Sequence, residues 1–90
     1  MLMLNLRYYS WIITLTGKWD EWVQTESRTI GELILELDEK YSGFKDVFIP
    51  PEMGKLNVRT AINLIRAGQP GKGIIDPGEK LQDGDLLVFY

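Results

Sequence analysis

Cysteine and histidine are both absent from this chain of 90 residues. Their absence excludes disulfides, thiolate nucleophiles, zinc sites of the usual kind and the commonest general base. We therefore expect no metal site, no cofactor and no catalytic residue, so that the protein is not an enzyme. An enzyme that uses carboxylates alone is the remaining catalytic alternative, but the acidic residues occur where turns and solvated helix faces place them.

Positive charge and long apolar runs are also scarce. Ten basic and thirteen acidic residues give a net charge of −3, and the basic ones form no cluster that could bind phosphates, so we expect no nucleic-acid partner. The apolar run at residues 1–4 is ended by Asn5, and Arg7 follows soon after. This run is far shorter than the roughly 20 apolar residues of a membrane span. No basic segment precedes a long apolar run, as it would in a signal peptide. We expect a cytoplasmic protein with no membrane partner.

The composition that remains is that of one small globular domain. The sequence is 44% apolar and 26% charged, with both signs spread along the chain rather than gathered in blocks. A chain this short closes a single core, so residues 1–90 are predicted to form one domain.

The first third of the chain predicts two strands. Residues 2–9 alternate with a period of two, which is typical of a strand with one apolar and one mixed face. Residues 19–25 follow as a second strand that returns beside the first, at the edge of the sheet. Residues 10–17 between them are richly apolar, and their spacing suits either a continued strand or a short helical turn.

A helix is predicted from residue 29 onward. Thr29 and Glu32 have the spacing of a capping box, in which the threonine oxygen accepts a free amide of the first turn and the glutamate reaches back to the cap residue. An apolar stripe follows at helical spacing and would lay one face on a sheet, formed by Ile30, Leu33, Ile34, Leu37 and Tyr41. Ser42 and Gly43 provide the stop.

The second half of the chain predicts mainly strands and loops. Residues 44–60, which contain two adjacent prolines, are expected to form a surface connection with a short extended piece at 47–49. Residues 61–67 are the next strand, with Ile62 and Leu64 facing inward. The glycine- and proline-rich residues 68–78 allow at most a short strand at 74–75. A tight turn at 82–85 leads into a last strand at 86–90.

This order predicts an α+β fold of the ubiquitin-like β-grasp type. Its mixed sheet has four to five strands, and one main helix packs across it. The last strand is unbrokenly apolar, which favours a place in the centre of the sheet next to the first strand.

The sequence also resembles the sulfur carriers among ubiquitin-like proteins, which include the small subunit of molybdopterin synthase and the thiamine sulfur carrier. The resemblance covers nearly the whole chain and depends on the shared order of four short segments. These are Arg7–Tyr9, Leu15–Lys18, Thr29–Leu33 with Glu39–Tyr41 at the end of the helix, and Leu81–Asp85.

The resemblance implies a carrier whose flexible tail ends in Gly-Gly, where an adenylating enzyme activates the carboxylate for conversion to a thiocarboxylate. Phe89 and Tyr90 stand at the end of the sequence instead. A carboxylate on Tyr90 would lack glycine's small size and the slack needed to enter a narrow active site, so carrier activity is doubtful. Three explanations stay open: the tail is missing from this sequence, the protein keeps only the binding surface of a carrier, or the likeness is one of fold alone.

The sequence predicts a protein-binding face on the sheet. If Leu87 and Phe89 face the helix, alternation places Leu86, Val88 and Tyr90 on the opposite face, beside the outward residues of the first strand. The predicted partner-binding residues are Arg7, Tyr9, Leu86, Val88 and Tyr90. The resemblance implies an adenylating enzyme or a larger synthase subunit as the protein partner. The alternatives are that residues 11–15 or 44–60 cover this face, or that the protein is a regulatory interaction module without sulfur chemistry.

Two further groups of residues have a structural and a functional interpretation. Three tryptophans, Trp11, Trp19 and Trp22, lie within twelve residues, and tryptophan is common among binding hot spots. We expect instead that two of the three are at least half buried as core residues, with Trp19 or Trp22 the one exposed on the edge strand. Asp83 and Asp85 could form a carboxylate pair for a metal or for acid-base catalysis. The glycine between them favours a turn in which they cap backbone amides.

Overall fold

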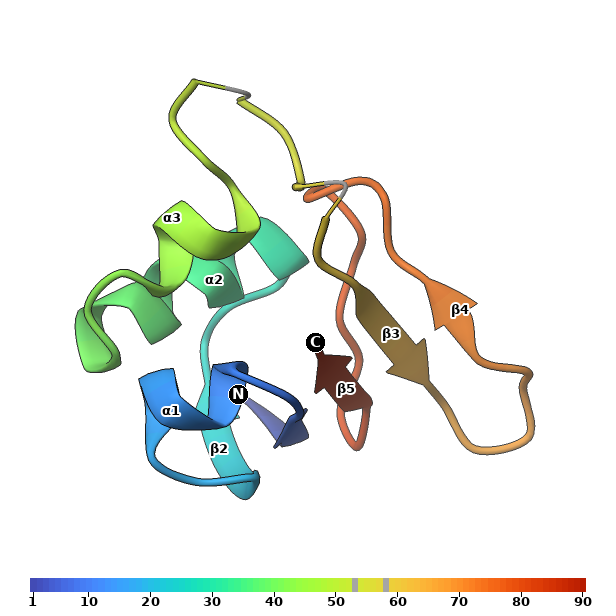
Figure 1. The fold of residues 1–90 in the computed structure, drawn as a ribbon. Helices are drawn as coiled ribbons and strands as arrows, with labels where there is room; N and C mark the ends of the chain where they lie inside the picture. The colour runs from blue at the N-terminus through green and yellow to red at the C-terminus, as the bar shows by residue number, and fades with distance from the viewer. Residues whose placement is uncertain (53, 58) are drawn as a thin grey trace.

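The computed structural model of the chain describes residues 1–52, 54–57 and 59–90. These residues form a mixed five-stranded sheet in the order β2-β1-β5-β3-β4 (Figure 1). The strands are β1 (Leu2–Tyr8), β2 (Asp20–Thr25), β3 (Ile62–Ile65), β4 (Lys72–Gly73) and β5 (Leu86–Phe89). The helices are α1 (Ile12–Thr16), α2 (Ile30–Lys40) and α3 (Phe44–Phe48). The predicted α+β class is confirmed.

The last strand lies in the middle of the sheet, as predicted. β5 runs parallel to β1, with Asn5 opposite Leu86 and Tyr8 opposite Phe89, and it pairs antiparallel with β3 on its other side. β2 is antiparallel to β1 and forms one edge of the sheet, which also agrees with the prediction.

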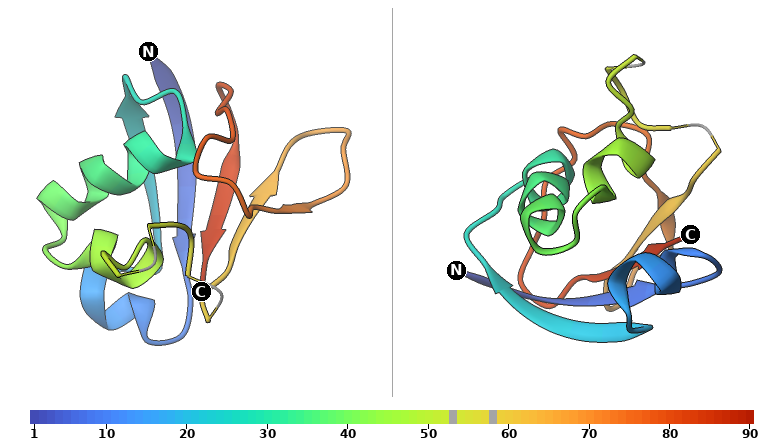
Figure 2. Two further views of the ribbon diagram at one scale, coloured as in Figure 1. Left: turned by 90° about the horizontal axis from the view of Figure 1, so that it is seen from above. Right: turned by 60° about the vertical axis from the view of Figure 1, so that its left-hand side comes forward.

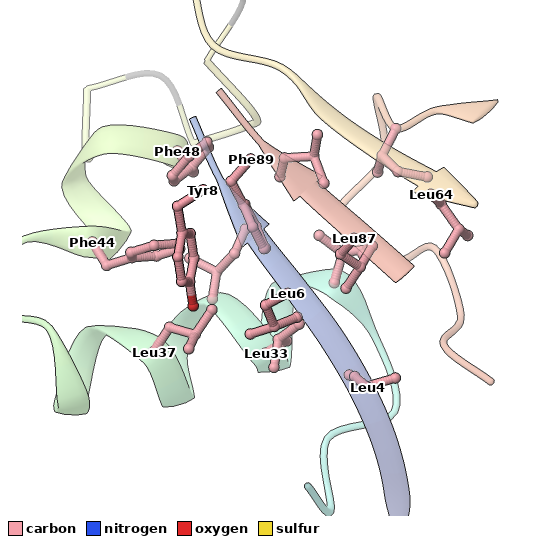
Figure 3. Packing of buried hydrophobic residues seen from close by; sticks show 14 of the residues in the cluster. Leu4, Leu6, Tyr8, Leu33, Leu37, Phe44, Phe48, Leu64, Leu87 and Phe89 are labelled. Carbon is pink, nitrogen blue, oxygen red and sulfur yellow. The ribbon is translucent and has the colours of Figure 1, made fainter. Parts of the chain in front are cut away.

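The helices gather on one side of the sheet, where they cover the core (Figure 2). Alternation along the central strands points fully buried side chains at them, because every second residue of a strand faces the same way. From β1 and β5 these are Leu4, Leu6, Tyr8, Leu87 and Phe89. They meet the apolar stripe of α2 and the two phenylalanines of α3 (Figure 3). The ring centroid of Phe89 lies 5.3 Å from those of Phe44 and Phe48, which are 4.9 Å apart, so the three rings form one cluster.

The start of α2 has the threonine half of the predicted capping box, whereas Glu32 reaches the residue before the cap instead of Thr29. Thr29 Oγ1 accepts a hydrogen bond from the amide of Glu32 at 3.2 Å, and the Glu32 carboxylate accepts one from the amide of Arg28 at 2.7 Å. The predicted helix therefore begins at the correct residue, and its buried residues are Ile30, Leu33, Ile34 and Leu37.

Three segments differ from the sequence-based expectations or go beyond them. Residues 10–17 adopt the helical alternative, since α1 buries Ile12 in the core. Residues 44–48 form α3, so the expected extended piece at 47–49 is wrong; Phe44 and Phe48, one helical turn apart, both reach the core. Residues 53 and 58 of the expected 44–60 connection lie outside the described residues. The short strand β4 falls at Lys72–Gly73 rather than at 74–75.

Across the residues that the structure describes, no helix has the length and apolar character needed to cross a membrane.

Candidate docking face of the sheet

The face of the sheet turned away from the helices, here called the outer face, is built from alternate residues of neighbouring strands. The register of β1 places Arg7 between Asp20 of β2 and Val88 of β5. The row beside it runs from Trp22 through Asn5 and Leu86 to Ile65 on β3, so four strands contribute to one surface. The twisted sheet and its uncovered side are visible in Figure 2.

The structure brings the five predicted partner-binding residues together on this face. Tyr9 and Tyr90 are each 43% exposed, Arg7 and Leu86 are half-buried, and Val88 is largely buried between its neighbours. Their backbones are held in place: the Tyr9 amide donates to the Phe89 carbonyl at 3.0 Å, and Tyr90 exchanges two backbone hydrogen bonds with Ala61. The partner-binding role of these residues is still a prediction.

The helical parts of the two segments that could have covered this face lie elsewhere. α1 places Ile12 in the core, and α3 places Phe44 and Phe48 there, so both pack on the helical side of the sheet. Tyr9 and Tyr90 consequently stay open to solvent.

Arg7 is the only cation on the described part of the outer face between β1 and β5. Its Nε atom is buried and has no hydrogen-bond partner among the described residues. The nearest carboxylate is that of Asp20, whose Oδ1 lies 4.0 Å away and already accepts a hydrogen bond of 2.6 Å from Asn5. A buried N–H without an acceptor costs free energy, so this guanidinium is suited to an acceptor supplied by another molecule.

Three exposed apolar residues of the same face were not among the predicted partner-binding residues. Met3 shares the face with Arg7 by alternation along β1, whereas Trp22 and Ile65 join it only through the register between strands. Trp22 is 63% exposed, Ile65 40% and Met3 36%. The expectation that two of the three tryptophans would be at least half buried is wrong: Trp11 and Trp19 are also more than half exposed. The phenylalanines of α3 and β5 fill the core instead of the indole rings.

Asp83 and Asp85 act in the turn before β5, as predicted. Asp83 accepts the amide of Met3 at 2.7 Å, and Asp85 accepts the amide of Gln82 at 2.8 Å. Asp85 is also buried against Arg66, a pairing that the sequence did not suggest. Within the described residues no three acidic side chains are placed to hold a metal ion.

A second buried carboxylate, Glu21, ties β2 to the end of α2. It accepts hydrogen bonds from the hydroxyls of Tyr8 at 2.5 Å and Tyr41 at 2.8 Å, and from Lys40 Nζ at 2.7 Å. Burial by itself would raise the pKa of Glu21, but these hydrogen bonds outweigh it and hold the pKa below its ordinary value. Burial, reinforced by Glu21, raises the pKa of Tyr8. These hydrogen bonds tie β2 to β1 through Tyr8 and to the end of α2 through Lys40 and Tyr41.

No protein-family model and no curated protein matches the sequence. Solved structures do match it over almost its whole length. SAMP1 from Haloferax volcanii aligns with a TM-score of 0.70 at 18% identity, covering 98% of this chain and 92% of SAMP1. The chain has the β-grasp fold of the ubiquitin-like sulfur carriers.

Two further structures agree. The putative molybdopterin converting factor subunit 1 from Pyrococcus furiosus aligns with a TM-score of 0.64 at 18% identity, covering 99% of this chain and 95% of the other. A chain of the BexX/CysO complex from Amycolatopsis orientalis aligns with a TM-score of 0.70 at 20% identity, covering 97% and 92%. The resemblance predicted from the sequence is thereby confirmed at the level of the fold.

Proposed function

We propose that this β-grasp protein is a noncatalytic docking partner that binds a larger protein through the outer face of its sheet. The observation that carries the proposal is the exposed apolar surface around Arg7, whose buried Nε has no acceptor among the described residues. Tyrosine, tryptophan and arginine are the residues most often found where binding energy concentrates in protein interfaces.

The arrangement favours a partner of a particular chemistry. An apolar surface would cover Tyr9, Tyr90 and Leu86, while a carboxylate or carbonyl oxygen reaches Arg7. Among the similar structures, one chain comes from a complex between CysO and BexX, which supports a protein partner for a fold of this kind. The noncatalytic part of the proposal draws support from Glu21 and Asp85, since both buried carboxylates are fully engaged by donors of the chain itself.

Photocrosslinking tests the docking face directly. A photoreactive phenylalanine analogue would replace Tyr9 on the outer face or, as the matched control, Leu35, which is 52% exposed on α2. We expect the Tyr9 position to give one discrete adduct in cells of the natural source and the Leu35 position to give none. The adduct would identify the partner.

Affinity for that partner then tests the named residues. The double variant Tyr9→Ala with Tyr90→Ala should bind at least about tenfold more weakly, whereas Leu35→Ala should bind like the wild type. Wild-type affinity in a folded double variant, or equal crosslinking from Leu35, would refute the docking face.

Sulfur transfer is the second candidate function, favoured by the likeness to sulfur carriers over the length of the chain. It requires a C-terminal carboxylate that an adenylating enzyme can activate. Incubation of the protein from its natural source with ATP, a sulfur donor and such an enzyme should exchange one oxygen for sulfur in the intact mass. An unchanged mass would leave the docking role without sulfur chemistry.

A further inference from the structure

β2 forms one edge of the sheet, and the side of this strand that faces away from β1 carries unpaired backbone groups. The odd-numbered residues of β1 donate to β5, as the amides of Asn5 and Tyr9 show, while the amide of Tyr8 donates to Trp19 next to β2. The antiparallel register therefore directs the amides and carbonyls of Asp20, Trp22 and Gln24 away from β1. In the described part of the chain no loop or side chain forms a hydrogen bond to these six groups. The other edge, β4, has only two residues.

A groove runs alongside this edge, between β2 and α2. It has a volume of about 530 Å³. Val23 and Leu37 line it with apolar atoms, and Glu36 and Glu39 of α2 line it with carboxylates. Lys40 also lines it, but its ammonium group is paired with Glu21. The groove runs along the strand, because α2 is joined to β2 near both of its ends. The Glu36 carboxylate accepts a hydrogen bond from Thr25 at one end, and Lys40 donates one to Glu21 toward the other.

The two elements that border the groove hold most of the negative charge of the protein. Residues 20–40 contain seven acidic and two basic side chains, a net charge of −5, whereas the whole chain carries −3. The rest of the chain is therefore net positive. One of the two basic residues, Lys40, is already paired with Glu21. Glu26, directly after β2, and Glu39 of α2 are exposed.

We propose that the β2 edge and its groove bind an extended, lysine- or arginine-rich segment of a partner protein, which joins the sheet as a sixth strand. The unpaired amides and carbonyls require an occupant with an extended backbone. The acidic border selects a basic one, and it disfavours a second copy of this chain, whose own β2 would bring Asp20 and Glu26 against like charges. This site adjoins the outer face at Trp22 but does not depend on the docking function proposed above.

A synthetic peptide tests the proposal by NMR. The probe is acetyl-Lys-Val-Lys-Val-Lys-Val-Lys-amide, and its controls replace every lysine by glutamate or the central valine by proline, which cannot complete the ladder. We expect the amide signals of Trp22 and Gln24 to shift on addition of the probe, and their hydrogen exchange to slow by about tenfold or more. The affinity should fall as salt is added. Neither control peptide should bind comparably.

Variants of the protein give the second part of the test. Glu39→Lys should weaken binding at least about threefold, while Glu52→Lys, the same charge change in the loop after α3 and away from β2 (Figure 1), should leave it unchanged. Gln24→Pro removes one outward amide and should weaken binding further without disturbing β1, because proline is tolerated where a strand amide faces solvent.

Three results would overturn the proposal. The first is absence of any shift at about 1 mM probe, which marks binding too weak to be specific. The second is a shift pattern centred on Tyr9 and Val88, which would place the peptide on the outer face. The third is protection of the Trp22 amide in a dimer without peptide, which would assign the edge to a second copy.

Discussion

The guanidinium of Arg66 donates to both carboxylate oxygens of Asp85, from Nε at 2.9 Å and from Nη2 at 3.2 Å. This pair joins the end of β3 to the turn that starts β5. The hydrogen bond to Asp85 raises the pKa of Arg66. The Asp85 carboxylate is buried, and it also accepts the amide of Gln82, so the start of the central strand depends on it.

Removing this carboxylate should therefore destabilise the protein. We expect Asp85→Ala to lower the free energy of unfolding by about 2–3 kcal/mol, because Arg66 and the Gln82 amide both lose their acceptor. Asp83→Ala, two residues away, removes one exposed hydrogen bond and should cost less than about 1 kcal/mol. Urea unfolding measures both values. Equal losses would contradict the structural role of the pair.

The Glu21 cluster should make the free energy of unfolding depend on pH in the acid range. The pKa of Glu21 is lowered from its ordinary value of 4.5 in the folded protein, so the unfolded chain takes up the proton first. The stability that this carboxylate contributes is fully present above pH 4.5 and is lost as the pH falls below that value toward the lowered pKa. Glu21→Gln should flatten this decrease and cost about 1–3 kcal/mol at neutral pH.

Unfolding of Glu21→Gln in urea over a series of pH values measures this effect. Glu39→Gln, which changes an exposed carboxylate of α2, serves as the control and should leave the acid profile as in the wild type. A wild-type acid profile in Glu21→Gln would show that the depressed pKa belongs to another group.

Aromatic truncations should separate the core from the outer face. Phe89→Ala removes a fully buried ring that contacts Tyr8, Phe44 and Phe48, and we expect a loss of about 3–5 kcal/mol. Trp22→Ala removes a larger but mostly exposed ring and should change stability by less than about 0.5 kcal/mol. Thermal and urea unfolding report both. If Phe89→Ala does not fold, Phe89→Leu should still show a measurable loss, and a greater loss in Trp22→Ala would contradict the burial pattern.

The cap of α2 makes a separate, smaller contribution. Thr29→Ala leaves the Glu32 amide without its side-chain acceptor and should destabilise the protein by about 1 kcal/mol. Thr14→Ala, within the short helix α1, removes a hydroxyl that bonds only the carbonyl of Trp11 and should have a smaller effect. Circular dichroism during urea unfolding measures the difference between the two variants.

Most of the fold could be predicted because local patterns define its elements. Alternation marked β1 and β5, and helical spacing with a capping box marked α2. α3 could not be predicted in this way, since the five residues Phe44–Phe48 have too few turns to show a period, and the prolines that follow favour a loop. Their helix exists because both phenylalanines reach the same core.

The residues of the candidate outer face could likewise be predicted only in part. Alternation alone placed Leu86, Val88 and Tyr90 on one face, but the addition of Trp22 and Ile65 required the register between strands, which no single segment contains. The exposure of all three tryptophans likewise depended on the tertiary packing, in which phenylalanine rings rather than indole rings fill the core.

The sequence by itself determined the two central strands, their inward and outward residues and the start of the main helix, because these depend on neighbours close along the chain. Only the tertiary structure decided the register between the strands, that Arg7 Nε has no acceptor among the described residues, and that within the same residues one edge of the sheet is free beside an acidic helix. These features arise from contacts between residues far apart in the sequence, whose free energies depend on packing and burial rather than on local spacing.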